Sequence, residues 1–284
     1  MRGYTLPAGK VQISFSGGRT SAYMLHQILA VNGPFDPDRV QVIFSNTGRE
    51  MPETLDFVQE VSERWGVHIV WVEGRPYNEA GDRFEIVSHN SASRNGEPFE
   101  QMIRRKKYLP NQQARFCTAE LKVRPARDYL RSIGWDHWKA ALGIRADEPR
   151  RINRDHQKER WQRWYPLADC QIDKHIVMNF WENQPFDLGL DVVRGNSALG
   201  NCDGCFLKSE AHLAMLARDY PDRHKWWQEM EALASSLTAS VNGARFRKEF
   251  TRAELGSYVD RQGDWIFDDE HGALCQASGG ECAG

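Results

Sequence analysis

The sequence lacks the features that mark membrane, secreted and strongly charged proteins. No hydrophobic run in its 284 residues approaches the length of a membrane span. The segment Met1–Pro7 has no apolar core of the kind found in signal peptides. The formal net charge is only -2, so no global field favours nucleic acid or a membrane surface. We therefore expect a cytoplasmic location without membrane contact, where thiols stay reduced.

The composition is that of a folded soluble protein, with 40% hydrophobic and 27% charged residues. A chain of 284 residues accommodates one large domain, or one domain with a smaller appendage. Six cysteines in a reducing compartment favour metal or redox chemistry over structural disulfides. Any one of them can instead be a buried, inert residue.

The first chemical signal is a glycine turn between a predicted strand and a predicted helix. Val11, Ile13 and Phe15 alternate as in a strand, and apolar residues recur at helical spacing from Thr20 onward. Backbone N–H groups at such a helix start form an anion site, which predicts phosphate binding. The alternative is an ordinary strand-to-helix turn, which needs one glycine rather than two. Hydroxyl donors at the turn come from Ser14, Ser16, Thr20 and Ser21.

Further strands are predicted at Val40–Ser45, Val67–Val72 and Trp138–Ile144, with a helix from about Pro52. Strands that alternate with helices indicate an α/β fold with a parallel sheet and right-handed crossovers. Ligands bind such sheets beyond the carboxyl ends of the strands. Three polar segments fall at such ends, namely Ser16-Gly17-Gly18, Asn46-Thr47-Gly48 and Arg145.

The chain is predicted to have two parts. Residues 1–165 form a nucleotide-binding α/β domain, in which the polar, irregular stretch 74–116 is a functional insertion. Residues 166–284 form a mostly helical C-terminal portion with a mobile tail. Helices are expected at 118–132, where Pro125 starts the regular part, and at 174–181 and 210–234.

A Cys-x-x-Cys pair, Cys202 and Cys205, is the main metal signal. Two thiolates at this spacing grip one metal centre from a tight loop. A dithiol redox pair is the alternative, but the thioredoxin-like context is missing. No histidine lies at zinc-finger spacing, so an iron–sulfur cluster is at least as well supported as zinc. Cys117, Cys275 and Cys282 are candidates to complete the site, whereas Cys170 adjoins a predicted helix start and can simply pack there.

Basic residues mark the predicted crevice, because guanidinium groups bind phosphate or sulfate with two parallel hydrogen bonds. A separate run, Arg104–Lys107, lies in the insertion and contacts either a nucleic-acid backbone or only solvent. The solvated face is favoured for this run. The crevice residues are Arg19, Arg49, Lys122, Arg124, Arg145, Arg150 and Arg151.

Together these segments resemble the phosphoadenosine phosphosulfate (PAPS) reductase family, within the adenine nucleotide alpha-hydrolase-like superfamily. SFSGGRTSAYML resembles the family's modified P-loop, and VIFSNTGREMPETLDFV its second nucleotide signature. RFCTAELKVRP is similar to the segment that pairs a cluster cysteine with a substrate-contacting lysine, and LGIRADEPRR to the arginine motif. YPLADCQIDKHIVMNFWENQPFDL is similar to the stretch before the Cys-x-x-Cys pair, so the resemblance covers residues 10 to 210.

The resemblance implies a doubly wound parallel sheet and a set of site residues. Lys122 and Arg145 would contact the phosphosulfate or a second phosphate, and Cys282 in the tail would be the catalytic nucleophile. A [4Fe-4S] cluster would be held by Cys117, Cys202 and Cys205, with Cys275 as our choice of fourth ligand. An adenine nucleotide (PAPS, adenylyl sulfate or ATP) would be bound by Ser16, Gly17, Gly18, Arg19, Thr20, Ser21, Asn46, Thr47 and Gly48.

The chain departs from the family pattern at three places. Cluster-bearing reductases of adenylyl sulfate carry an adjacent cysteine pair where this chain has only Cys117. The reductase tail keeps its Glu-Cys here as Glu281-Cys282, but the histidine that follows in the family is missing. Relatives that split ATP carry an aspartate where this chain has Thr20, and a neutral hydroxyl is a poorer Mg²⁺ ligand than a carboxylate.

Three functions follow from this pattern. The leading one is a sulfonucleotide reductase-like oxidoreductase that acts on a small nucleotide and takes electrons from a thioredoxin-like donor. The second is an ATP-dependent iron–sulfur sulfurtransferase of the ATP pyrophosphatase type that modifies nucleic acid, which the run Arg104–Lys107 favours and Thr20 disfavours. The third is a nucleotide sensor without turnover.

Overall fold

The computed structural model describes residues 2–153, 159–193, 196–238 and 243–262. Its core is a six-stranded sheet in the order β4-β3-β2-β1-β5-β6. All neighbouring strands are parallel except β4, which runs antiparallel to β3 at one edge. The strands are β1 (Val11–Phe15), β2 (Val40–Asn46), β3 (Ile69–Gly74), β4 (Phe84–Val87), β5 (Trp138–Ala141) and β6 (Trp161–Trp164).

Strand β1 occupies the centre of the sheet because its residues are buried from both sides. Val11 pairs with Val40 of β2 on one side and with Lys139 of β5 on the other. Val11, Ile13 and Phe15 are almost completely buried, as is typical of a parallel sheet covered on both faces. The chain leaves β1 toward β2 and later returns to its other side with β5. This reversal creates a topological switch point at the carboxyl end of β1.

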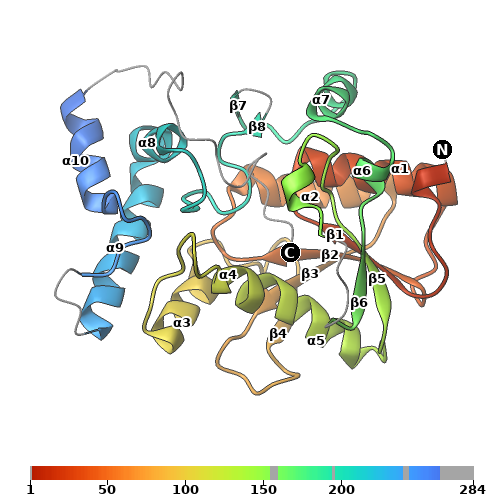
Figure 1. Cartoon of the computed structure of the whole chain (residues 1–284), viewed down its shortest axis with the longest axis horizontal. Helices are drawn as coiled ribbons and strands as arrows, with labels where there is room; N and C mark the ends of the chain where they lie inside the picture. The colour runs from red at the N-terminus through yellow and green to blue at the C-terminus, as the bar shows by residue number, and fades with distance from the viewer. Residues whose placement is uncertain (1, 154–158, 194–195, 239–242, 263–284) are drawn as a thin grey trace.

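Helices cover both faces of the sheet, as Figure 1 shows. Helices α1 (Arg19–Asn32), α2 (Pro52–Trp65), α6 (Pro166–Asp169) and α7 (Lys174–Glu182) lie above the strands in that view. Below the strands lie α3 (Glu97–Lys106), α4 (Phe116–Thr118) and α5 (Arg124–Ser132). A π-helical turn, η2 (Ala119–Val123), joins α4 to α5, and short 3₁₀ turns lie at η1 (Arg2–Tyr4) and η3 (Pro149–Arg151).

A helical group at one end of the molecule holds the last described part of the chain (Figure 1). It consists of α8 (Glu210–Asp219), α9 (Pro221–Leu237) and α10 (Arg252–Gln262), which contact one another, and α9 also contacts α3. A small hairpin of β7 (Val192–Val193) and β8 (Asn196–Ser197) precedes it. The group therefore packs, through α3, against the part of the molecule that contains the sheet.

The expected α/β sheet is confirmed, and several details differ from the sequence-based expectation. The stretch 74–116 is not simply irregular, since it contains β4 and α3. The helix expected over 210–234 is two helices, because Pro221 starts α9 directly after Tyr220. The helix expected over 118–132 is divided by η2, and Pro125 lies in the first turn of α5 as expected. Helix α10 was not expected.

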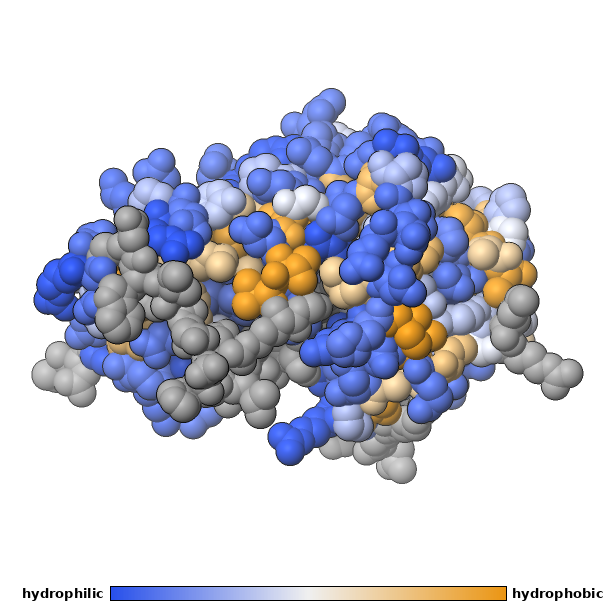
Figure 2. All heavy atoms as spheres, turned by 90° about the horizontal axis from the view of Figure 1, so that it is seen from above, coloured by the Kyte–Doolittle hydropathy of each residue, from blue (hydrophilic) through white to orange (hydrophobic). Residues whose placement is uncertain are grey.

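The surface seen from above in Figure 2 is mostly hydrophilic, with hydrophobic residues gathered in small patches near the middle of this face. Among the described residues, no helix combines the length and hydropathy that crossing a membrane requires.

Candidate functional site

An open pocket with an empty volume of about 770 Å³ lies at the switch point of the sheet. It extends along β1, β2, β5 and β6 from Gln12, Trp138 and Trp161, near the starts of their strands, and η2 and α5 complete its walls. Its other end lies at Ser16 and Gly143, beyond the carboxyl ends of β1 and β5. This is the place where ligands bind open α/β sheets. The pocket is lined by Gln12, Ser14, Phe15, Ser16, Ser21, Ile43, Ser45, Lys122, Val123, Ala126, Arg127, Trp138, Ala140, Leu142, Gly143, Arg151 and Trp161. We call it the sheet-end pocket.

The glycine loop, residues Ser16–Ser21, borders this pocket and is held by short-range hydrogen bonds. The Ser21 hydroxyl donates to the Gly18 carbonyl at 2.9 Å and accepts from the Ser16 backbone N–H at 3.2 Å. The Ser16 and Ser21 hydroxyl oxygens are 2.9 Å apart. Gly17 has φ +77°, and a Cβ there would lie 2.7 Å from Thr54 Cγ2. The turn therefore requires glycine at residue 17, and α1 begins two residues later at the pocket.

The Arg19 side chain points away from the sheet-end pocket into the C-terminal portion. Its guanidinium forms an ion pair with Asp187 and donates to Ser197 Oγ at 2.8 Å and to the Leu190 carbonyl at 3.1 Å. Burial raises the pKa of Asp187, but the hydrogen bond and charge of Arg19 outweigh it and leave this pKa below its usual value. Arg19 thus ties the glycine loop to residues 187–197.

Arg145 follows β5 and is buried beside the glycine loop. Its Nη1 donates to Thr20 Oγ1 at 3.1 Å, and its Nε donates to Asp147 at 2.9 Å. The backbone N–H of Arg145 donates to Glu148, which also forms an ion pair with Arg151. Of these residues Arg151 lines the sheet-end pocket. Arg145 therefore contacts the loop through Thr20.

The segment Asn46-Thr47-Gly48 belongs to a second site instead of the sheet-end pocket. Asn46 is fully buried and donates to Glu73 at 2.7 Å and to the Ser93 carbonyl at 2.9 Å. Thr47 donates to Glu50 at 2.8 Å, and its hydroxyl lies 3.2 Å from the sulfur of Cys202. The nucleotide-binding assignment of this segment therefore stays a prediction, and Thr47 places the segment beside Cys202.

Cys117, Cys202 and Cys205 line one pocket, which we call the cysteine pocket. Its empty volume is about 530 Å³. Cys117 comes from α4, whereas the other two come from the loop before α8. The pocket is otherwise lined by Thr47, Phe99, Thr118, Leu121, Lys122, Asn201, Phe206, Leu207, Lys208 and Trp227. Cysteines that are 85 and 88 positions apart in the chain are thus brought to one mostly apolar cavity.

Backbone pairing brings the Cys-x-x-Cys loop to the turn after β2. Glu50 and Cys202 form an antiparallel bridge, and the Asp203 N–H donates to the Arg49 carbonyl at 2.9 Å. Asn201, directly before Cys202, has φ +55°, a left-handed conformation in which asparagine is enriched. The loop conformation is therefore specified by its own residues and by the β2–α2 turn.

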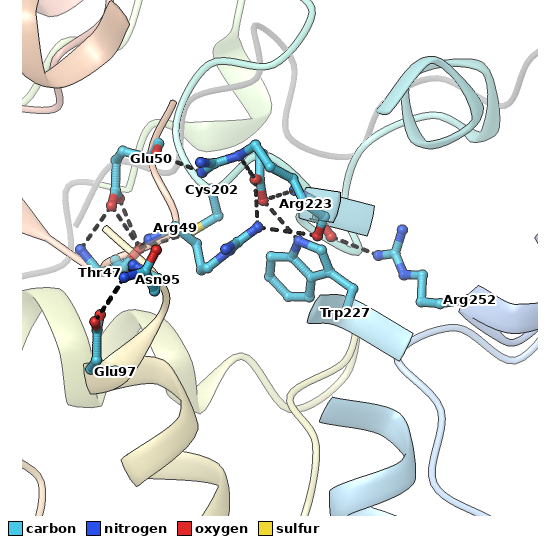
Figure 3. A network of polar contacts seen from close by, with 11 residues as sticks. Thr47, Arg49, Glu50, Asn95, Glu97, Cys202, Arg223, Trp227 and Arg252 are labelled. Atoms are coloured by element: carbon cyan, nitrogen blue, oxygen red, sulfur yellow. Dashed lines mark hydrogen bonds and ion pairs between the residues drawn. The ribbon is translucent and has the colours of Figure 1, made fainter. Parts of the chain in front are cut away.

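A buried charge network surrounds this loop, as Figure 3 shows. Asp203 is completely buried and accepts from Arg49 at 2.8 Å, from Arg223 at 2.5 Å and from the indole N–H of Trp227 at 2.8 Å. The Gly204 N–H also donates to Asp203, at 2.6 Å. Burial lowers the pKa of Arg49, and the charge of Asp203 opposes this shift. One carboxylate therefore pairs with two guanidinium groups, which come from α9 and from the turn after β2.

Arg252 of α10 reaches the same loop from the opposite side (Figure 3). It donates to the Gly204 carbonyl at 2.6 Å, and its Nε and Nη1 have no hydrogen-bond partner among the described residues. Burial lowers the pKa of Arg252 to about 10, against the opposing charges of Glu231 and Cys205. A completely buried cation with two unused donors next to Cys205 favours an anionic group in this region.

The thiol of Cys202 is not activated by this environment. Burial, followed by the negative charge of Glu50, raises the pKa of Cys202 to about 12. Within the described ranges, no three His, Cys, Asp or Glu side chains are grouped closely enough to hold a metal ion. The fourth candidate ligand, Cys275, lies outside those ranges, as does Cys282.

Lys122 lines both pockets and is the side chain that connects them. It lies in η2, and its amine donates to Asn201 Oδ1 at 3.2 Å. Because Asn201 precedes Cys202, this bond links the sheet-end pocket to the Cys-x-x-Cys loop. A cation between a candidate phosphate site and a group of cysteines can contact a ligand that spans the two.

Cys170 lies apart from the cysteine pocket. It follows α6, and a Cβ added at Gly3 would lie 2.3 Å from its sulfur. Cys170 therefore packs against the N-terminal turn η1, in line with the interpretation of a packing residue.

Several residues near the pockets were not singled out from the sequence. Arg127 lines the sheet-end pocket, as do Trp138 and Trp161, whose rings stack 5.5 Å apart. Arg127 follows Lys122 by five positions on a basic segment, which is a weak signal. Asp203 lies between the two cysteines of the Cys-x-x-Cys pair. It was a signal in the sequence for a buried ion pair, because a charge in that position needs a partner when the loop is buried.

Comparison with known proteins agrees with this geometry. Residues 10–174 match the phosphoadenosine phosphosulfate reductase domain. The uncharacterized nin region protein ORF290 of Escherichia phage lambda is 32% identical, over 73% of this chain and 69% of that protein. An uncharacterized 37.8 kDa protein of Escherichia phage 186 is 24% identical, over 82% of this chain and 78% of that protein.

Among solved structures, the phosphate complex of PAPS reductase from Candida auris matches with 18% identity and a TM-score of 0.42, over 66% of this chain and 81% of that chain. The family match covers the strands, the glycine loop, Cys117, Lys122 and Arg145, and it ends before the Cys-x-x-Cys loop. The chain belongs to the phosphoadenosine phosphosulfate reductase domain family.

Proposed function

We propose that the chain is a sulfonucleotide reductase-like enzyme that binds an adenine nucleotide in the sheet-end pocket and acts on its sulfur beside the cysteine pocket. Membership of the PAPS reductase domain family supports a nucleotide-binding function in sulfur chemistry. The observation that carries the finer proposal is the position of Lys122, which lines both pockets.

The nucleotide phosphates lie at the start of α1 in this proposal. The backbone N–H groups at the start of α1 form the positive end of the helix dipole, which favours an anion there. Lys122 and Arg127 add positive charge on the pocket wall. Arg145 acts through Thr20, because its hydrogen bond to the Thr20 hydroxyl fixes the first turn of α1.

Three thiols line the cysteine pocket, which supports a [4Fe-4S] cluster there, although within the described ranges they are not grouped around one point as a single metal ion requires. Cys117, Cys202 and Cys205 would hold three irons, and Cys275 remains our choice for the fourth. The fit is supported by Lys122, Lys208 and the buried Arg252, because these cations favour an anionic thiolate-bound group. When bound, such a cluster supplies a redox centre beside the nucleotide.

The reaction proposed for Cys282 conserves atoms and electrons. Its thiolate attacks the sulfur of the phosphosulfate group, and the bond from that sulfur to the phosphate oxygen breaks. The nucleotide leaves with the bonding electron pair, and Lys122 neutralises the added charge. A thioredoxin-like dithiol then forms a mixed disulfide with Cys282 and releases sulfite. The second thiol of the donor resolves that mixed disulfide, which restores Cys282 and leaves the donor as a disulfide.

The cluster is tested by anaerobic purification with iron and sulfide counted. We expect about four of each per chain, and a loss of most of both in Cys117→Ser, Cys202→Ser and Cys205→Ser. Cys170→Ser is the matched control, since Cys170 packs at η1, and it should keep the full content. Equal loss in all four variants would reject the cysteine pocket as the cluster site.

The reaction is tested by sulfite release from PAPS and from adenylyl sulfate with reduced thioredoxin supplied. Cys282→Ser should keep iron and nucleotide binding but release no sulfite. Pyrophosphate release from ATP that depends on RNA or DNA, without sulfite release, would instead assign the sulfurtransferase function. Tight nucleotide binding without either reaction would assign a sensor.

A further inference from the structure

Positive charge is concentrated in one short part of the chain. Residues 101–131 contain nine lysines and arginines and two acidic residues, a net charge of +7. The whole chain carries -2, so all other residues together carry -9. The near-neutral total therefore hides a strongly basic segment. A net charge of -2 for the whole chain does not exclude an anionic partner for this segment.

The two acids of this segment are buried and do not offset its outer surface. Glu120 is 4% exposed and forms ion pairs with Lys106 at 2.7 Å and Arg124 at 2.5 Å. Asp128 is 1% exposed and pairs with Arg127. Solvent and solutes therefore meet mainly the cations of the segment.

The exposed cations form one surface at the end of α3 and in the loop that follows, which we call the basic surface. Arg105, Lys107 and Arg115 are exposed and form no ion pair with any described residue, whereas Arg104 pairs with Glu100. Figure 1 shows α3, α4 and α5 following one another along the same side of the sheet. The basic surface therefore continues into η2 and α5, where Lys122 and Arg127 line the sheet-end pocket.

Aromatic rings lie among these cations. Tyr108 is 50% exposed, and its ring lies 6.1 Å from that of Phe116. The Lys106 amine lies 5.8 Å from the centre of the Phe116 ring. Tyr108 is an exposed ring directly after the unpaired Lys107. Proteins bind single strands with such elements, because bases stack on the rings while the phosphates meet the cations.

We propose that the basic surface, Arg104–Tyr108 together with Arg115, binds single-stranded nucleic acid. The inference rests on charge and aromatic placement and holds whether or not the sulfur reaction occurs. A single strand is favoured over a duplex because stacking on Tyr108 requires an unpaired base. Arg115 precedes Cys117 by two residues, so a strand bound at the basic surface would lie near α4, which contributes Cys117 to the cysteine pocket.

The test is fluorescence anisotropy with a labelled deoxythymidine oligonucleotide of about 16 nucleotides. The variant Arg105→Glu/Lys107→Glu reverses two cations of the basic surface. The matched control is Lys225→Glu/Lys248→Glu, which makes the same charge change at exposed positions in the helical C-terminal group. Circular dichroism and nucleotide binding confirm that both variants remain folded.

We expect the Arg105/Lys107 variant to bind at least tenfold more weakly, while the control stays within twofold of the parent. The slope of log affinity against log salt should fall by about 1.4 in the first variant, because two phosphate contacts are lost. Tyr108→Ala should weaken binding without changing that slope.

Three results would overturn the proposal. One is failure of the parent to bind the oligonucleotide at about 50 mM salt. Another is an equal loss in the control, which would indicate only overall charge. The third is tighter binding of a duplex or a polyglutamate peptide than of the single strand. Sulfite release by a chain that fails these tests would leave the proposed function standing, so the two conclusions fail separately.

Discussion

The two loops that border the pockets are held in opposite ways. The turn Ser16–Gly18 of the glycine loop is fixed by hydrogen bonds to Ser21, no more than five positions away. Only the end of the loop has distant partners, since Arg19 pairs with Asp187 and Thr20 accepts from Arg145. The Cys-x-x-Cys loop is fixed by Arg49, Trp227 and Arg252, which lie 154, 24 and 48 positions from their partners in the loop. The turn of the glycine loop is therefore specified locally, whereas the whole Cys-x-x-Cys loop is specified by the assembled tertiary structure.

The two sites therefore depend on distant residues to different degrees. Distant changes should leave the turn Ser16–Gly18 intact and should affect the glycine loop only through the partners of Arg19 and Thr20. The Cys-x-x-Cys loop depends on a buried carboxylate that faces two guanidinium groups, and removing one partner of such a set costs more than the set contributes. Four substitutions test the comparison.

The largest effect is expected for Asp203→Asn, which breaks the network at its centre. Arg49 and Arg223 would keep their buried charges without a counter-ion, which costs about 3–5 kcal/mol in the free energy of unfolding. Urea denaturation measures the loss, and iron content should fall with it. Asp260→Asn, an exposed aspartate of α10, is the control and should change stability by less than about 0.5 kcal/mol. A small loss in Asp203→Asn would show that the loop does not depend on this carboxylate.

A smaller loss is expected for Gly17→Ala in the glycine loop. The added Cβ would meet Thr54 Cγ2 at 2.7 Å and Phe44 and Val58 at 3.1 Å, and φ is +77°. Crowding of this kind costs about 1–3 kcal/mol, in addition to about 1 kcal/mol for the left-handed conformation. Gly66→Ala is the control, because Gly66 has φ +59° but no atom within 4 Å of the added Cβ. Thermal unfolding of both variants separates crowding from backbone strain, and equal losses would contradict the crowding argument.

Ser21→Ala should cost about 1 kcal/mol, because the Ser16 N–H loses its partner, whereas the Gly18 carbonyl still accepts from the Ala22 N–H. The effect should be confined to the glycine loop. Nucleotide affinity should fall, while the iron content and the near-ultraviolet circular dichroism of Trp227 should stay at the parent's values. A change at Trp227 would mean that the two loops are coupled, contrary to the comparison.

The smallest effect is expected for Asp187→Asn, as a change in how stability depends on pH. Asp187 links the C-terminal portion to Arg19 of the glycine loop. Its pKa is lowered in the folded protein by Arg19, so its ion pair stabilises the fold above the unfolded pKa of about 4. This contribution is lost as the pH falls through the lowered value. Asp187→Asn should therefore be less stable at pH 7 and should lose less stability on acidification from about pH 5 to pH 3 than the parent does. Parallel pH profiles would show that the pair does not contribute.

The sequence predicted the locally specified features well. Period-two burial in β1 and β2, glycines at the turn and Pro52 at the start of α2 are all signals within a few residues, and the structure confirms those elements. Strand β6 and helix α10 were missed, because Trp161–Trp164 has a short half-exposed pattern and α10 is mostly polar. Their positions are set by packing against β5 and against α8 and α9.

The same distinction applies to the site. The cysteines could be grouped from their type and spacing, and the structure brings three of them to one cavity. The partner of Arg49 could not be predicted, since nothing near residue 49 in the sequence indicates Asp203. Likewise, nothing near residue 19 in the sequence indicates that the Arg19 side chain points to Asp187 rather than to the sheet-end pocket.

The π-helical turn η2 sets the rotational register of the site. Cys117 and Lys122 are five residues apart, and in an ordinary α-helix their directions would differ by about 140°. Both nevertheless line the cysteine pocket, because the wider turn between them accommodates one more residue. If the same residues formed an α-helix, Lys122 would rotate by about 100° relative to Cys117. A relative with this cysteine and lysine four residues apart in a regular helix would present them similarly, so backbone register, not residue identity alone, decides which homologues share this geometry.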